Sequence, residues 1–216
     1  MSITSRPDEI QQFINELDRN LFNLEEYLIS PFREFIIDVD DYLNEVTSKN
    51  EKLSKEFVKN YFNNDSFHDH MLDLTMETYK YDSIYRNFNV SSNFLNAYSI
   101  FESFFKDLCK DYTDFYNIKL ELKHIKEHNE IRKCKVYLDK AVGLNLNELD
   151  DTWNKIQGYQ KIRNAIIHKN SKFDMNEIKN LNYLKSLSSI NIHKDGKIFF
   201  TSVNFISNFS ILYLNI

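Results

Sequence analysis

Three side chains near position 165 could act together on a phosphodiester. Arg163, Asn164 and His168 lie in the sextet Arg-Asn-Ala-Ile-Ile-His, within a segment of apolar periodicity. A guanidinium binds phosphate oxygens through paired N–H donors, and an imidazole, with a usual pKa of about 6.5, transfers protons at neutral pH. Such a set can hold a phosphate and move a proton beside it. Cleavage of RNA is the reaction that this chemistry favours.

A glutamate and a lysine on an earlier segment could join this set. Glu102 and Lys106 are four residues apart in a segment that is predicted to be helical, so they share one face of that helix. The sextet is short and degenerate, so a functional prediction also needs support from the helices around it.

The segment that contains the sextet is predicted to form a helix over residues 148–168, with apolar residues on two faces. At about 100° per residue, one face carries Ile162, Ala165 and Ile166. The other face carries Trp153, Ile156, Gln160 and Ile167. A helix that is apolar on both sides is covered on both sides. We expect the core of the domain on one side and another helix or a second protomer on the other.

Arg163, Asn164 and His168 flank the second apolar face. Asn164 and His168 are four residues apart, and Arg163 is about 140° from His168 around the axis, which a long side chain can span. The three could therefore converge on one ligand at the edge of a cleft. A structural role explains the same residues, because Arg163 can form an ion pair and a protonated histidine interacts favourably with the end of a helix. Geometry leaves both interpretations open.

Composition favours a helical fold and excludes two common phosphate-binding designs. Only three glycines and two prolines occur in 216 residues, too few for the turns of a many-stranded protein. The glycines, Gly143, Gly158 and Gly196, are far apart, so neither a GxGxxG nor a GxxxxGK loop is present. The usual P-loop and dinucleotide-binding folds are thereby excluded.

Apolar spacings of three and four predict a mostly helical chain, with breaks at Pro31, residues 63–66 and residues 87–92. We expect helices over residues 8–24, 32–46, 53–62, 67–88, 93–116, 131–142, 148–168 and 174–187. Alternation around Asp195-Gly196 predicts a small β-hairpin over residues 190–200. Thr201 or Ser202 can begin a terminal helix.

Acidic and basic residues are distributed unevenly along the chain. Residues 1–64 carry 7 Lys+Arg against 13 Asp+Glu, whereas residues 119–172, which include the sextet, carry 12 against 7. A basic surround suits a phosphodiester substrate, although an ordinary solvated surface explains it equally well. We expect an acidic N-terminal helical region over residues 1–64 and a second domain over residues 65–216.

The chain is expected to be a soluble cytoplasmic protein without a metal or cofactor. Cys109 and Cys134 lack metal-ligand spacing, and the sequence shows neither a secretory leader nor an apolar run of membrane-spanning length. His124 and His128 could bind a metal together with Glu121 or Glu127 if that stretch is helical. Their surroundings are rich in lysine, so we favour surface residues near nucleic acid.

The sextet resembles the Arg-x4–6-His signature of the HEPN superfamily, whose members include many RNA-cleaving toxins, anticodon nucleases and phage-defence effectors. Phe101-Glu102-Ser-Phe-Phe-Lys106 resembles the Glu-x3-Lys element on an earlier helix of several such nucleases. The resemblance covers about residues 67–216, including a late hairpin and terminal helix that some members append. It implies an all-α bundle, here with an N-terminal helical extension and the small hairpin before the last helix.

The resemblance also implies a role for each residue of the set. Arg163 would stabilise the developing charge on the scissile phosphate, and His168 would act at the 2′-hydroxyl or the leaving oxygen. Asn164 would hold the phosphate or the imidazole, and Glu102 would position the arginine or a neighbouring catalytic group. The substrate-binding residues would be Lys106, Tyr159 and Lys169.

The resemblance further implies a metal-independent endoribonuclease, acting as a toxin or antiphage effector. Two protomers would pack their sextet helices together so that both Arg/His pairs line one cleft. RNA, a second copy of the chain and an antitoxin or other operon-encoded protein are the expected partners. The alternative is a catalytically inactive HEPN-like module that binds RNA, a nucleotide or a partner protein. A purely structural helical interaction protein is a third possibility.

Overall fold

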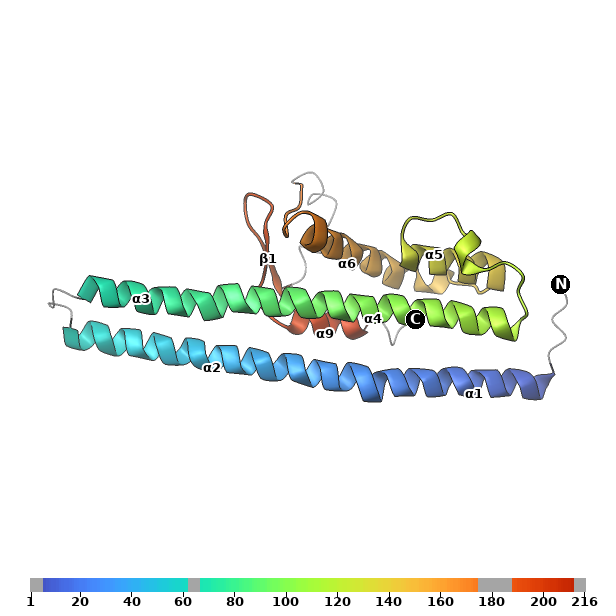
Figure 1. The fold of residues 1–216 in the computed structure, drawn as a ribbon, viewed down its shortest axis with the longest axis horizontal. Coiled ribbons are helices and arrows are strands. Elements are labelled where there is room, and N and C mark those ends of the chain that lie inside the picture. Colours follow the sequence, from blue (N-terminus) through green and yellow to red (C-terminus); the bar gives the residue numbers. More distant parts are fainter. Residues whose placement is uncertain (1–5, 62–66, 175–187, 212–216) are drawn as a thin grey trace.

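The computed structural model describes residues 6–61, 67–174 and 188–211. The described chain is predominantly helical, with one two-stranded antiparallel hairpin near its C-terminal end and a helix after it (Figure 1). The predicted all-α class with a late hairpin and a terminal helix is confirmed at this level. No described helix is both long enough and apolar enough to cross a bilayer.

Two long helical rods lie side by side and dominate the shape of the molecule (Figure 1). The first rod consists of α1 (Pro7–Leu24), a π-helical turn (Glu25–Ile29) and α2 (Ser30–Tyr61). The second rod consists of α3 (Phe67–Tyr79), a π-helical turn (Lys80–Tyr85) and α4 (Arg86–Phe115). The remaining elements pack against α4.

The breaks expected at Pro31 and at residues 87–92 are absent, so the predicted helix boundaries were wrong there. Pro31 is tolerated because it is the second residue of α2, directly after a π-helical turn that shifts the hydrogen-bond register. Within α4, Asn93 Nδ2 donates to the Asn89 carbonyl at 3.0 Å, and Val90 and Phe94 are fully buried. Burial of these apolar residues outweighs the preference of Asn and Ser for helix ends.

One aromatic core joins α4 to α6 (Asp150–His168) and α9 (Asn204–Ile211). Seven large aromatic side chains are almost fully buried in it: Phe94, Tyr98, Phe101, Phe105, Tyr159, Phe205 and Phe209. Between α4 and α6 the chain forms a 3-10 turn (Leu122–His124), α5 (Glu130–Tyr137), a π-helical turn (Leu138–Val142) and a second 3-10 turn (Asn147–Leu149). Because rings of this size dominate core energetics, α6 is firmly placed on α4.

The N-terminal rod contributes to the same core. Phe13 of α1 stacks on Phe115 of α4 with a centroid separation of 4.1 Å, and Ile36 of α2 belongs to the central apolar cluster. The division into residues 1–64 and 65–216 stays a prediction, and the turn expected at 63–66 falls outside the described residues. The helix expected over residues 174–187 also falls almost entirely outside them.

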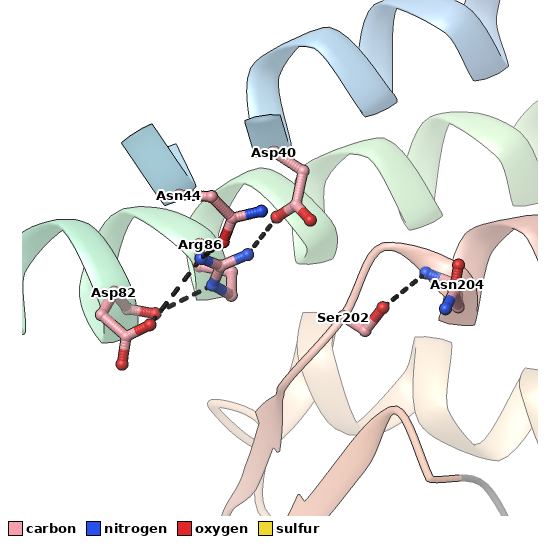
Figure 2. Close-up of polar contacts among 6 residues, drawn as sticks. All are labelled: Asp40, Asn44, Asp82, Arg86, Ser202 and Asn204. Carbon is pink, nitrogen blue, oxygen red and sulfur yellow. Dashed lines mark hydrogen bonds and ion pairs between the residues drawn. The ribbon is translucent and has the colours of Figure 1, made fainter. Parts of the chain in front are cut away.

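A buried arginine ties the two rods together where α4 begins (Figure 2). The guanidinium of Arg86 forms an ion pair with Asp40 and donates a hydrogen bond to Asn44 Oδ1 at 2.8 Å. It also donates to the carbonyl of Asp82 at 3.1 Å. Burial raises the pKa of Asp40 and outweighs the opposing effect of Arg86. The network fixes the register of α2 against α4.

The hairpin consists of β1 (Ile190–Ile192) and β2 (Ile198–Phe200), close to the predicted range. Gly196 in its turn has a φ of +85°, and its carbonyl accepts a hydrogen bond from the Phe173 amide at 2.9 Å. The hairpin is thereby attached to the segment that follows α6. Ser202 Oγ accepts from the Asn204 amide at 3.1 Å at the start of α9 (Figure 2), as expected for a helix-capping serine.

Candidate functional site

Arg163 is held in place by its own helix and by α4. Its guanidinium donates to Asn164 Oδ1 at 3.2 Å, and its Cζ lies 5.9 Å from the centroid of the Tyr98 ring. A cation over an aromatic face is attracted by the ring electrons. Arg163 and Asn164 are both half-buried, so the guanidinium is oriented and still reaches the surface.

Glu102 lies close enough to share this environment. Burial raises the pKa of Tyr98 far above its usual range, the charge of Glu102 raises it further and the charge of Arg163 lowers it. Both charges therefore act on the same phenol. The structure thus places the Arg163 guanidinium over the Tyr98 ring, and the charge of Glu102 acts on the same phenol.

Lys106 lies one helical turn after Glu102 on α4. Its ammonium is 3.2 Å from Glu130, and both side chains are substantially exposed. An exposed ion pair of this kind contributes little to stability, so it can be exchanged for a phosphate contact at small cost. Lys106 is thus an exposed cation of α4 that is paired with Glu130.

His168 lies apart from this cluster. It is the last residue of α6 and is exposed, and its imidazole makes no hydrogen bond to any part of the chain that the structure describes. Lys169 follows it at the helix end and is also exposed. Arg163 and His168 thus share the helix, and among the described residues no hydrogen bond joins their side chains.

Tyr159 is a correction to the sequence prediction. Its side chain is 0% exposed and its ring lies 4.9 Å from Phe209 and 5.2 Å from Phe205. It packs in the aromatic core and cannot contact a substrate at the surface. Tyr159 lies one turn before Arg163, and it faces inward because the side of α6 that carries it packs against α4 and α9.

The second apolar face of the sextet helix also differs from its prediction. Trp153 and Ile156 are buried by the chain itself, with 3% and 2% exposure. Of this face, only Ile167 retains a large exposed apolar surface, at 45%, and Gln160 beside it is half-buried. The exposed apolar surface of this face is therefore small. It consists mainly of Ile167, which lies between Arg163 on one side and Asn164 and His168 on the other.

One residue of the site was missed by sequence reasoning, which did not single out Tyr98. Tyr98 is four residues before Glu102, which places both on one side of α4 and is the signal that could have identified it.

The histidines that could have bound a metal lie in a different arrangement. The chain is not helical between His124 and His128, so they are not neighbours on one helix face. His124 Nδ1 accepts a hydrogen bond from the Glu121 amide at 3.2 Å at the start of a 3-10 turn. Within residues 6–61, 67–174 and 188–211, no three His, Cys, Asp or Glu side chains gather as metal ligands do.

Comparison with known proteins finds no matching family model, no matching curated protein and no matching solved structure.

Proposed function

We propose that the chain is a metal-independent endoribonuclease of the HEPN type, with an HEPN-like helical bundle. The observation that carries the proposal is the placement of Arg163. Its guanidinium is oriented by Asn164 and the Tyr98 ring, with Glu102 nearby, and His168 is exposed at the end of the same helix. An oriented cation and an exposed imidazole are two groups that phosphodiester cleavage without a metal can use.

The reaction transfers a phosphoryl group within the RNA. The 2′-oxygen forms a bond to phosphorus while the bond from phosphorus to the 5′-oxygen breaks, leaving a 2′,3′-cyclic phosphate and a 5′-hydroxyl. His168 takes the proton of the 2′-hydroxyl or supplies the one that the 5′-oxygen needs, and water accepts or supplies the other proton. Arg163 stabilises the charge that builds on the phosphate oxygens. Asn164 and Glu102 hold Arg163 in position, and Lys106 and Lys169 bind the strand.

A second copy of the chain completes the site in this proposal. Among the described residues no hydrogen bond joins His168 to Arg163, and Ile167 is exposed between them. Pairing of two sextet helices across Ile167 would bring the histidine of one protomer toward the arginine of the other. A cytoplasmic toxin or antiphage effector, neutralised by an antitoxin or another operon-encoded protein, is the biological role that we infer.

An inactive HEPN-like module that binds RNA, a nucleotide or a partner protein is the second candidate. It is favoured by the separation of His168 from the Arg163 cluster. In that case Arg163 recognises a phosphate group and His168 contributes no proton transfer.

The test uses purified protein in EDTA and an RNA oligonucleotide that it cuts at a mapped position. Replacing the single nucleotide before that position by its 2′-deoxy form should leave this bond intact, because the nucleophile is missing. Cleavage of the substituted bond at the original rate would contradict the mechanism. Binding of both oligonucleotides without any cleavage would favour the inactive module.

A further inference from the structure

A pocket of about 390 Å³ lies where α4, the end of α6 and the hairpin meet. We call it the hairpin pocket, and its wall includes the aromatic rings of Tyr79, Phe88 and Phe199 and the polar side chains of Asn87, Asn170 and Lys197. Its volume falls within the range of about 300–1,000 Å³ that is typical of small-molecule sites. Tyr79 and Phe88 are well exposed, at 50% and 67%, so their rings are available to a ligand.

The backbone at one edge of the pocket is held in an uncommon conformation. Asn170 and Ser171, which line the pocket directly after the sextet helix, have φ values of +50° and +58°. Asparagine adopts this region more readily than most residues, and a left-handed residue commonly ends a helix. Hydrogen bonds fix the turn, because the Ser171 amide donates to the Ala165 carbonyl at 2.9 Å and the Ser171 carbonyl accepts from the Ile198 amide at 2.8 Å.

The pocket opens beside the cluster around Arg163. Phe88, Leu95 and Glu102 are spaced by seven residues along the rod and therefore lie along one side of α4. Leu95 lines the pocket, and so does Ile166, which lies one turn after Arg163 on α6. The hairpin pocket thus lies one turn of α6 beyond Arg163.

We propose that the hairpin pocket binds one nucleotide of the strand that lies across the candidate site, with its base on the aromatic rings and its phosphate at Lys197. The identity of the strand as RNA rests on the proposed function. Exposed rings stack on unpaired bases, and amide and hydroxyl groups hydrogen-bond to base edges. The ammonium of Lys197 lies 5.3 Å from the Phe199 ring, which places a cation at the border of the stacking surface.

The first test measures binding without cleavage. A fluorescent 2′-O-methyl RNA oligonucleotide, which cannot be cut, is titrated with the full chain while its anisotropy is followed. Phe88→Ala should weaken binding about 5- to 100-fold, the equivalent of losing one stacked base. Phe35→Ala is the matched control, since Phe35 is an exposed phenylalanine of α2 outside the pocket and its loss should leave the affinity unchanged.

The second test measures the phosphate contact. Lys197→Ala should lower the slope of log affinity against log salt by about 0.7, the value for one neutralised phosphate of a single strand. Lys194→Ala removes a lysine from the same hairpin turn, outside the pocket, and should keep the slope of the wild type. Equal slopes for wild type and Lys197→Ala would overturn the assignment of this lysine.

The outcomes separate this inference from the proposed function. If His168→Ala abolishes RNA cleavage while Phe88→Ala binds and cleaves like the wild type, the hairpin pocket is not a nucleotide site and the nuclease stands. If no RNA is cleaved but Phe88→Ala alone loses affinity, the pocket is supported and the nuclease is contradicted. Absence of any RNA binding by the wild type would overturn the pocket assignment.

Discussion

The guanidinium of Arg163 lies 5.9 Å from the centre of the Tyr98 ring, on the helix opposite its own. Tyr98 is almost completely buried, so the ring forms a fixed platform at the edge of the core. An arginine held in this way loses less conformational freedom when it binds a phosphate. In the proposed function, this relationship orients Arg163 for binding a phosphate group.

The identity of this cation should matter as well as its charge. We expect Arg163→Ala to lower kcat/KM for RNA cleavage by about 10²–10³-fold, the usual cost of losing one donor to a transition-state oxygen. Arg163→Lys should recover only part of the loss, because an ammonium neither forms paired hydrogen bonds to phosphate nor stacks on Tyr98 in the same way.

The control for this prediction is Lys161→Ala, which removes an exposed cation from the same helix. It should cleave RNA like the wild type. Circular dichroism verifies that all three variants are folded. Full recovery of activity by Arg163→Lys would show that only charge is needed and that the Tyr98 platform has no role.

Removing only one partner of the buried ion pair between Arg86 and Asp40 should strongly destabilise the folded chain. Arg86→Met leaves Asp40 buried without a partner and should lower the free energy of unfolding by about 3–5 kcal/mol. Arg33→Met breaks a more exposed pair with Glu25 at 3.2 Å and should cost about 0–1 kcal/mol. Urea denaturation measures both.

The double variant Arg86→Met/Asp40→Leu completes this experiment. It removes both charges, so it should regain most of the stability lost in Arg86→Met. If the double variant is less stable than Arg86→Met alone, the unpaired carboxylate is not the source of the loss.

Gly196 should be required for docking of the hairpin. An added Cβ there would meet the Phe173 carbonyl, and the φ of +85° disfavours any other residue. Gly143 has a similar φ of +86° but nothing within 4 Å of an added Cβ. Gly143→Ala should therefore show only the backbone cost, about 1–2 kcal/mol, whereas Gly196→Ala should cost clearly more. Equal free energies of unfolding for the two variants would show that the close approach of residue 196 to the Phe173 carbonyl adds no cost.

Asp195 should make the stability of the hairpin depend on pH. The Lys172 ammonium, 3.0 Å away, and hydrogen bonds from His193 and the Lys197 amide hold the pKa of this carboxyl well below its usual range. A carboxyl group whose pKa is lower in the folded state stabilises the protein at pH values above its unfolded-state pKa, about 3.9. This contribution is lost as the pH falls below that value.

The thermal midpoints of wild type and Asp195→Asn measure this effect. Their difference should be constant between about pH 7 and pH 5 and should shrink below about pH 4. A difference that grows as the pH falls would reverse the sign and contradict the assignment.

The fold was predictable where a local pattern determines it. The helix that ends at His168 and the hairpin around Gly196 followed from apolar spacing and from an Asp-Gly turn. The continuous rods did not, because π-helical turns accommodate Pro31 and the burial of Val90 overrides the capping preference of its neighbours.

The assignment of Arg163, Asn164, His168 and Glu102 as a site stays a prediction. Glu102 was expected to position Arg163 or a neighbouring group, and the charges of Glu102 and Arg163 both act on the pKa of Tyr98. The inward turn of Tyr159 and the coverage of Trp153 depend on the angle at which α6 packs on α4. That angle is set by ring packing across the core, which spacing along one helix does not encode.

The central claim is that this site cleaves RNA by proton transfer at His168. The most direct measurement is the initial rate of RNA cleavage in EDTA by wild type and His168→Ala, with Lys161→Ala as control and with the product ends identified. We predict a loss of about 10²–10⁴-fold in His168→Ala, an unchanged rate in Lys161→Ala, and wild-type products that carry 2′,3′-cyclic phosphates. Equal rates for wild type and folded His168→Ala would contradict the account.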